Sequence, residues 1–193
     1  MKATACVSIT PKGVCVNGKN TFENVFLETE KKLFSVIYKA LGISYPKFYK
    51  MDRLSKLGFL GVEILKQKID VDKYSDQAIS QIFTNSYSSL DTDVKHQDSL
   101  NKMMTPSPAV FVYTLPNIVM GEIAIRNGFY GENIFTLSDE FSPQTWIDLV
   151  DIQFKLNKAD AVVGGWIELM DDSFDLRLFF VEKDEVNSKY EIK

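Results

Sequence analysis

Histidine and cysteine are scarce in this sequence. Among 193 residues there are one histidine, His96, and two cysteines, Cys6 and Cys15. Two cysteines are too few for a disulfide framework, so we expect two reduced, half-buried thiols. The shortage of histidine limits the possible chemistry more than any other feature of the composition. His96 lies in a polar stretch, where we expect it to be exposed.

Long apolar runs and an excess of positive charge are also lacking. No segment approaches the roughly 18–20 apolar residues that span a bilayer, and the N-terminus has no apolar core followed by a cleavage site. We therefore expect a cytoplasmic protein with no membrane partner. With 22 Lys and Arg against 26 Asp and Glu, the net charge is -4. A chain of that charge has no overall attraction to phosphate, which argues against a nucleic-acid partner.

What is present is typical of a globular domain. Hydrophobic residues make up 45% and charged residues 25% of the chain, and the length fits one domain over residues 1–193. Apolar periodicity alternates between strand-like and helix-like segments, which indicates an α/β fold with a mixed sheet. The five main expected strands are Ala3–Ile9, Ala78–Thr84, Glu132–Ser138, Ala159–Met170 and Phe174–Val181. A short apolar segment, Val14–Val16, precedes the turn residues Asn17-Gly18 and is typical of a hairpin. The expected helices are Phe26–Leu41, Phe48–Gln67, Leu90–Met103, a helix from Ile118 that stops at Gly128, and Pro143–Asn157.

Two pairs of glycines predict close packing inside these elements. Gly58 and Gly61 lie within an expected helix, where glycine costs stability relative to alanine, so the helix should pack closely against another element there. Gly164 and Gly165 interrupt an expected strand, which predicts a close backbone approach or a bulge.

An ordered set of short motifs covers nearly the whole chain from about Tyr45 onward. The motifs are Tyr49–Lys56, Ser89–Asp93, Ser107-Pro108, Phe111, Thr114–Asn117, Gly121–Ile125, Gly128, Gly131, Ser138, Ala159-Asp160 and Gly164-Gly165. In this order and at this spacing, the set resembles the N-terminal half of the β-ketoacyl-acyl-carrier-protein synthases. The resemblance implies a single half of the thiolase fold, with a mixed five-stranded sheet and helices on both faces.

The departures from the family concern its catalytic residues. An active ketosynthase carries a cysteine nucleophile between the strand that matches Glu132–Ser138 and the next helix. Spacing from Gly131 and from Asp160 places that position at Glu140, beside Asp139. The family also uses two histidines from its C-terminal half, and His96 matches neither. The resemblance therefore implies a protein similar to a chain length factor, with no catalytic residue and no cofactor, that is inactive alone.

Several roles remain open for Glu140 and Asp139. Both carboxylates could satisfy amides at the start of the next helix. Glu140 could instead mimic the acidic or amide group that replaces cysteine in decarboxylating or chain-length subunits, or it could accept an acyl group. Elsewhere, Asp171, Asp172 and Asp175 form a loose acidic cluster without the pattern of an EF-hand. We interpret that cluster as a solvated turn and expect no metal site.

A single half of this fold would leave apolar surface without cover. Leaving large side chains in water forfeits about 1.5–3 kcal/mol for each one. Such a patch usually marks an interface. The expected interface residues on the last helix are Trp146, Ile147, Val150 and Phe154. Ile134 and Thr136 lie on the strand that, in the family, pairs across the dimer axis, and they complete the expected interface.

We therefore predict a non-catalytic ketosynthase-like subunit. Its partner would be an active ketosynthase or a second copy of itself, in bacterial fatty-acid or polyketide-type synthesis, with polyene pigments as one setting. Lys31, Lys32, Lys47 and Lys50 are scattered positive charges that are most simply a solvated face, but they could meet an acidic acyl carrier protein. One alternative is a small standalone enzyme, a decarboxylase or hydrolase of acyl thioesters that uses Glu140 or Asp139 as a base. Another is a degenerate relative that serves only as a scaffold. The acyl chain, the identity of the partner and the completeness of the chain stay open.

Overall fold

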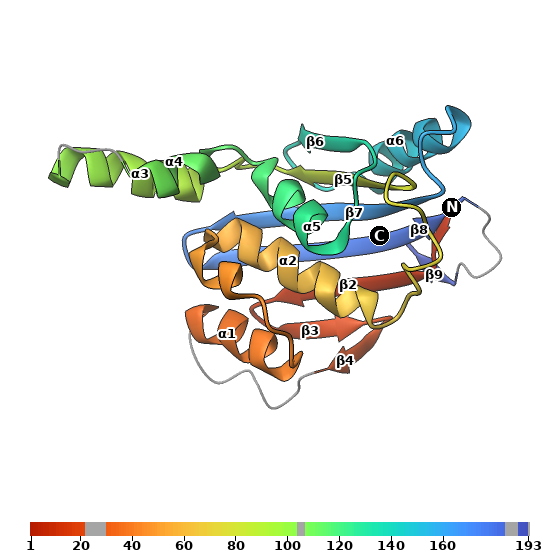
Figure 1. The fold of residues 1–193 in the computed structure, drawn as a ribbon, viewed down its shortest axis with the longest axis horizontal. Helices are drawn as coiled ribbons and strands as arrows, with labels where there is room; N and C mark the ends of the chain where they lie inside the picture. Colours follow the sequence, from red (N-terminus) through yellow and green to blue (C-terminus); the bar gives the residue numbers. More distant parts are fainter. Residues whose placement is uncertain (22–29, 104–106, 184–188, 193) are drawn as a thin grey trace.

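A seven-stranded mixed sheet forms the centre of the computed structural model, which describes residues 1–21, 30–103, 107–183 and 189–192. The strand order is β4-β3-β2-β8-β7-β5-β6 (Figure 1). Among the strands of the described residues, β5 alone makes parallel pairs, with β6 on one side and β7 on the other. The strands are β2 (Ala5–Thr10), β3 (Gly13–Val16), β4 (Lys19–Thr21), β5 (Ile79–Asn85), β6 (Asn133–Leu137), β7 (Ala161–Met170) and β8 (Ser173–Glu182); β1 (Lys2–Ala3) and β9 (Tyr190–Glu191) form a separate pair.

The predicted five-stranded sheet is therefore too small by two strands. The hairpin strand β3 and the short β4 extend the sheet beyond β2. Val14 and Val16 of β3 are buried in the same core as the buried residues of β2, which explains why the hairpin adds to the sheet. Strands of three or four residues carry too little periodicity to be counted from the sequence.

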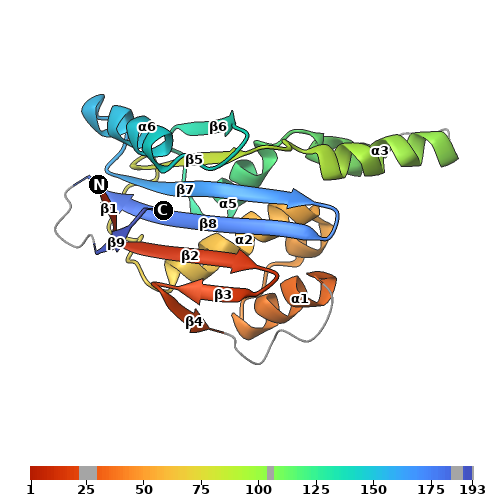
Figure 2. The ribbon, with the colours of Figure 1, turned by 180° about the vertical axis from the view of Figure 1, so that it is seen from behind.

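Helices cover both faces of the sheet, as predicted. Helices α1, α2 and α5 lie on one face (Figure 1), and α6 lies on the other (Figure 2). The segment of α3 and α4 extends away from one end of the sheet in both views. The helices are α1 (Glu30–Ala40), η1 (Pro46–Lys50, 3-10), α2 (Arg53–Lys66), α3 (Leu90–Met103), α4 (Pro108–Phe111), η2 (Val112–Thr114, 3-10), α5 (Ile118–Asn127) and α6 (Pro143–Lys155). The first residues of the predicted helix Phe26–Leu41 lie outside the described residues.

Helix α2 packs tightly against the sheet and α5. Its N-cap is Asp52, whose carboxylate accepts a hydrogen bond from the Ser55 amide at 2.9 Å. This cap divides the predicted single helix Phe48–Gln67 into η1 and α2, because an N-cap residue adopts an extended backbone. A Cβ on Gly58 would lie 2.4 Å from Val119, and one on Gly61 would lie 2.3 Å from Leu176. The predicted close packing at both glycines is confirmed.

Strand β7 runs without interruption through Gly164 and Gly165. A Cβ on Gly164 would lie 1.8 Å from the carbonyl oxygen of Ile82, and one on Gly165 would lie 2.2 Å from that of Arg177. The glycines thus allow a close backbone approach of the neighbouring strands, one of the two predicted outcomes, and they do not end the strand.

Helix α6 buries its apolar side against its own sheet. Trp146, Val150 and Phe154 are 1%, 0% and 8% exposed, and they belong to a second core cluster with Ile82 and Phe179. The prediction that these three side chains await a partner is wrong, because the sheet of the same chain already covers them. Ile147 packs at the margin of this cluster and is half-buried.

Both cysteines are free and half-buried, as predicted, and they lie on neighbouring strands β2 and β3. Burial raises the pKa of the Cys6 thiol. Within the described ranges, no single helix is long and apolar enough to cross a membrane. In the same ranges, one bent pair, Pro108–Thr114 and Ile118–Asn127 with an angle of 101° between its parts, passes that test by length and composition.

Candidate functional site

The strand-to-helix corner between β6 and α6 carries the residues singled out in the sequence. Strand β6 ends at Leu137 and α6 begins at Pro143, so Glu140 lies between them, where the carboxyl end of β6 leads into the helix. The corner is tied to the neighbouring parallel strand by the Ser138 amide, which donates to the carbonyl of Asn85 at 2.9 Å. The Ser138 hydroxyl donates to the backbone carbonyl of Glu140 at 2.8 Å. The backbone of Glu140 is therefore held in place.

An aromatic cluster fixes the residue that follows Glu140. The ring of Phe141 stacks on Phe179 at 6.1 Å between centroids and contacts Trp166 at 6.2 Å. Phe179 also contacts Trp146, 5.8 Å away, whose indole N–H donates to the buried carbonyl of Ile82 at 2.9 Å. The corner is thus anchored to the sheet by apolar packing from both sides of the α6 start.

The side chains of Asp139 and Glu140 themselves face solvent. Ser142 caps α6, since its hydroxyl accepts a hydrogen bond from the Thr145 amide at 3.3 Å. Among the hydrogen bonds of the described residues, neither carboxylate accepts one from an α6 amide, so the predicted role as helix-terminus anions falls to Ser142. A carboxylate that acts as a general base works best in a dry pocket, and this exposed corner does not provide one.

Polar groups that the sequence did not reveal hold the loop after β5 beside this corner. The Glu168 carboxylate of β7 accepts hydrogen bonds from both the amide and the hydroxyl of Ser86, at 2.7 and 2.6 Å. The Asn85 side chain closes a local turn with Ser88, donating to its carbonyl at 2.8 Å and accepting from its amide at 2.9 Å. Ser86 and Glu168 are 82 residues apart in the sequence, so no local sequence pattern predicts their contact.

His96 and the acidic cluster lie outside this corner. His96 is half-buried on α3, because its ring packs 5.6 Å from the ring of Phe111; the prediction that it is exposed is only partly right. Asp171 and Asp172 form the turn between β7 and β8, and Asp175 is paired with Arg177. Within the part of the chain that the structure describes, no three His, Cys, Asp or Glu side chains are placed to hold a metal ion.

Strand β6 is an edge of the sheet. Among the described strands it pairs only with β5. The predicted interface residues of this strand are both half-buried: Ile134 packs on the second core cluster, and the Thr136 hydroxyl lies 2.7 Å from that of Thr84. Unpaired edges offer backbone groups to another chain, so the edge of β6 remains a candidate interface.

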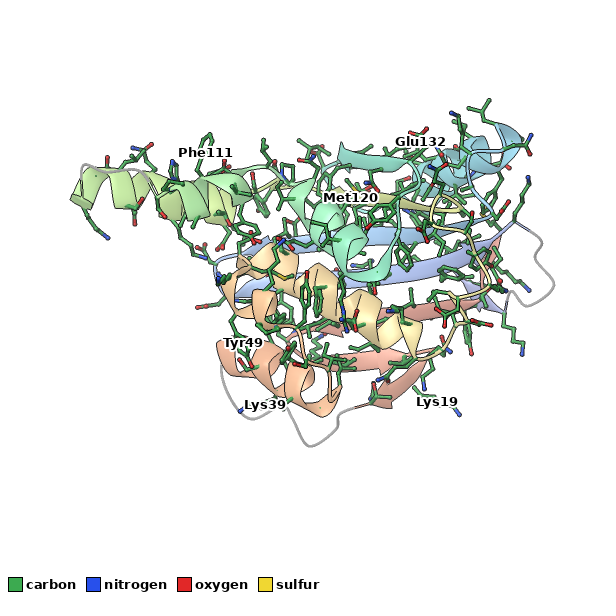
Figure 3. The ribbon with its side chains drawn as sticks, in the orientation of Figure 1. Lys19, Lys39, Tyr49, Phe111, Met120 and Glu132 are labelled. Carbon is green, nitrogen blue, oxygen red and sulfur yellow. The ribbon has the colours of Figure 1, made fainter. Side chains whose placement is uncertain are left out.

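Exposed apolar side chains gather near the same end of the parallel strands. They lie at the end of β6, on the segment of α3 and α4 that projects from the sheet, and on η2 and the residue after it. Their exposed fractions range from 40% to 61%: Leu90, Val94, Phe111, Val112, Leu115 and Leu137. Phe111 lies on the projecting segment, whereas Glu132 marks the opposite end of β6 (Figure 3). Exposed apolar patches commonly mark interaction surfaces.

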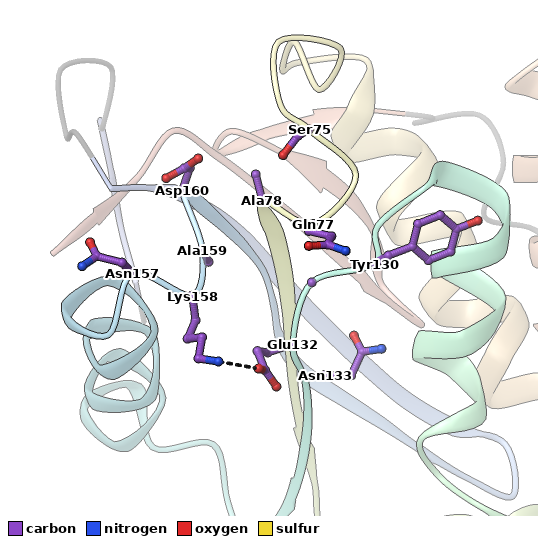
Figure 4. A pocket seen from close by; sticks show the side chains of 11 residues that line it. Ser75, Gln77, Ala78, Tyr130, Glu132, Asn133, Asn157, Lys158, Ala159 and Asp160 are labelled. Atoms are coloured by element: carbon purple, nitrogen blue, oxygen red, sulfur yellow. Dashed lines mark ion pairs between the residues drawn. The ribbon is translucent and has the colours of Figure 1, made fainter.

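A polar pocket lies at the other end of the parallel strands. It has a volume of about 560 Å³ and is lined by residues that precede or begin β5, β6 and β7 (Figure 4). Lys158 and Glu132 form an ion pair across it at 3.5 Å. Because the parallel strands run away from this pocket toward the corner, it is separate from Glu140.

Comparisons with known proteins add information on the fold. No protein-family model matches the sequence, and no curated protein matches it as a sequence relative. Among solved structures, the chain is similar to the ishigamide ketosynthase/chain length factor, with 15% identity and a TM-score of 0.69 over 96% of this chain and 62% of that one. It is also similar to a chain in the complex of a type II PKS acyl-carrier protein with its ketosynthase bound to the hexaketide, AntDE:AntF, with 13% identity and a TM-score of 0.67 over 95% of this chain and 62% of that one.

A third similar structure is the ketosynthase ApeO in complex with its chain length factor ApeC from Xenorhabdus doucetiae. The identity is 10% and the TM-score 0.55, over 94% of this chain and 79% of that one. The chain thus spans less than two thirds of the length of the first two structures. Over nearly all of its own length, the protein has the thiolase fold of ketosynthases and chain length factors.

Proposed function

We propose that the protein is a non-catalytic ketosynthase-like subunit that pairs with an active ketosynthase, or with a second copy of itself, through the edge of β6. The pathway class is fatty-acid or polyketide-type synthesis in bacteria, with polyene pigments as one setting and the cytoplasm as the location. An acyl carrier protein is a further partner in this proposal. The observation that carries it is the edge strand β6 beside a group of exposed apolar side chains.

The chemistry of the corner supports a role without catalysis. A thiol at a helix start becomes a thiolate because the helix dipole lowers its pKa. Glu140 offers a carboxylate instead, which is a poor nucleophile toward a thioester, and the whole sequence holds a single histidine. The carboxylate faces solvent at the surface of the corner. Nothing in this arrangement supplies the cysteine and two histidines on which condensation depends in the resembled family.

The surface around β6 supports pairing. An unpaired strand edge next to exposed apolar side chains is unfavourable in water and becomes favourable when a second chain covers it. Leu137, at the end of β6, is 61% exposed, and Phe111 on the projecting segment is also 61% exposed. A partner strand laid against β6 would bring a second chain over Leu137. Comparable pairs are named among the similar structures, as complexes of a ketosynthase with a chain length factor.

Co-expression tests the pairing directly. The tagged chain is co-expressed with each cysteine-containing ketosynthase of the same genome and purified, and the mass of the complex is measured by light scattering. Leu137→Arg should abolish the complex, because it places a charge at the edge of the interface. Leu156→Arg is the matched control, since Leu156 is 62% exposed but lies at the far end of α6. A monomer under all conditions, or equal effects of both variants, would overturn the proposal.

The alternative of a standalone enzyme has no structural observation in its favour, and an assay separates it from the pairing role. Turnover of a malonyl thioester is measured with the free chain and with Glu140→Ala. We expect no turnover in either protein. A measurable rate that disappears in Glu140→Ala would contradict the non-catalytic role.

A further inference from the structure

A second pocket lies where the start of α2 meets α3 and α4. Its volume is about 250 Å³, and its wall is mainly apolar, with Met51, Val110 and Tyr113 among the lining residues. Lysines from two elements, Lys56 of α2 and Lys95 of α3, also line it. An apolar hollow with cations at its margin is suited to a ligand that has an apolar body and an anionic group.

Two acidic side chains, Asp52 in the lining of this pocket and Asp91 beside it, already have partners. The Asp91 carboxylate forms an ion pair with the Arg53 guanidinium, with 2.8 Å between nitrogen and oxygen, and a second ion pair with Lys95. Asp52 caps α2 with one carboxylate oxygen, and the other accepts a hydrogen bond from the Thr92 hydroxyl at 2.8 Å. Neither carboxylate is left to balance a further cation.

Two lysines of the pocket have no such partner. Within the described residues, neither Lys50 nor Lys56 forms a hydrogen bond or an ion pair with an acidic side chain. The Lys56 ammonium lies 5.8 Å from the centre of the Phe48 ring. Four cations line the pocket, against one lining carboxylate, Asp52. Even with the neighbouring Asp91 counted, the pocket keeps a net positive charge, which is suited to an anion.

The environment of the Lys56 ammonium favours an anion beside it. Burial lowers the pKa of the Lys56 ammonium, and Lys95 nearby lowers it further, although Asp52 acts in the opposite direction. A bound anion beside Lys56 would compensate part of this burial cost, because it would form the direct ion pair that Lys56 does not make with any described carboxylate.

We propose that this pocket binds a small organic carboxylate with an apolar body, such as a short-chain or aromatic acid. The carboxylate would lie against Lys56 and Lys50, and the carbon chain against Met51, Val110 and Tyr113. At about 30 Å³ for each water-sized group, the pocket holds roughly eight non-hydrogen atoms, the size of hexanoate. This proposal does not depend on pairing with a ketosynthase, so it can fail while the proposed function stands, and the reverse also holds.

Titration of the free chain with hexanoate, followed by NMR chemical shifts of the pocket amides, tests the site. We expect a Kd of about 1 mM or tighter, as ligands of this size can reach. Hexanamide has the same shape without the charge, and inorganic phosphate has charge without the apolar body. Both should bind at least about tenfold more weakly than hexanoate if charge and apolar wall act together.

Two variants keep the test independent of folding. Lys56→Met removes the charge and should weaken hexanoate binding about tenfold or more, whereas Lys19→Met, on the distant edge strand β4, should leave it unchanged. Ala109→Trp, at an exposed position of the pocket lining, should fill the pocket and block binding without removing any charge. Equal binding of hexanoate and hexanamide, no binding of either, or unchanged binding in both pocket variants would overturn the proposal.

Discussion

Trp146 offers the sharpest test of how α6 is held. If its side chain is buried against the sheet of its own chain, Trp146→Ala must destabilise the free protein. The side chain is 1% exposed and donates a hydrogen bond to Ile82. Replacing a buried tryptophan by alanine costs about 3–5 kcal/mol of unfolding free energy. In a chain of this length that lowers the Tm by roughly 6–20 °C, at about 2–4 °C for each kcal/mol.

The measurement is urea unfolding of the isolated chain, followed by far-UV circular dichroism. Trp146→Phe keeps most of the ring volume but leaves the Ile82 carbonyl without its indole donor, so it should cost about 1–3 kcal/mol. Leu156→Ala, at an exposed position next to the end of α6, should change the stability by less than about 0.5 kcal/mol. If Trp146→Ala lowers the unfolding free energy no more than Leu156→Ala does, the tryptophan is not part of the core. That result would support the sequence-based prediction that this side chain belongs to an interface.

Further predictions concern backbone packing, a charged cluster and a helix cap. Gly164→Ala should give a protein that is strongly destabilised or insoluble, because its Cβ would overlap a backbone carbonyl. Gly121→Ala has open space around it and should raise the unfolding free energy by up to about 1 kcal/mol. Thermal unfolding of the two variants compares these effects. Burial alone would raise the pKa of the Glu182 carboxyl, but hydrogen bonds, first that from Lys73, hold it below its ordinary value of 4.5. A lowered carboxyl pKa stabilises the fold above pH 4.5 and loses that effect as the pH falls through the folded-state value, so the stability difference between the protein and Glu182→Gln should shrink below about pH 4.5 in urea unfolding. Ser142→Ala should cost about 0.5–2 kcal/mol by calorimetry, because it removes the cap of α6, and an unchanged Tm would contradict that role.

Local sequence signals predicted the individual elements well. The polar helix Leu90–Met103 has the predicted bounds. Asn17 and Gly18 both have positive φ, as a hairpin turn of this kind requires. Gly128 ends α5 in the left-handed conformation, where glycine has no steric cost. These features depend on residues close together in the chain, so a single sequence contains enough information to place them.

Features that depend on distant residues were predicted less well. The periodicity of α6 shows that one face is apolar, but it does not say whether a sheet of the same chain or another protein covers that face. The same limit applies to the candidate site. Spacing located Glu140 between β6 and α6, whereas the hydrogen bonds between Ser86 and Glu168 and the stacking of Phe141 on Phe179 join residues that have no pattern in common.

The strand-to-helix corner keeps its shape without using the side chain of residue 140. Its contacts come from the backbone carbonyl of Glu140, from Ser138 and from the ring of Phe141, while the Glu140 carboxylate faces solvent. A change of side chain at this position should therefore cost the fold little, because the corner does not depend on that side chain. Glu140→Cys should accordingly change the unfolding free energy by less than about 0.5 kcal/mol.

The same variant separates the shape of the corner from its chemistry. The new thiol of Glu140→Cys should react with iodoacetamide faster than the half-buried Cys6 and Cys15, as mass spectrometry of the labelled peptides would show. It should still give no condensation of acyl thioesters, because the sequence offers only His96, on α3, where the resembled enzymes use two histidines. A large loss of stability would show that residue 140 supports the corner. A condensation rate from the variant would show that a thiol at this position is enough for condensation, which would contradict the expected need for two histidines.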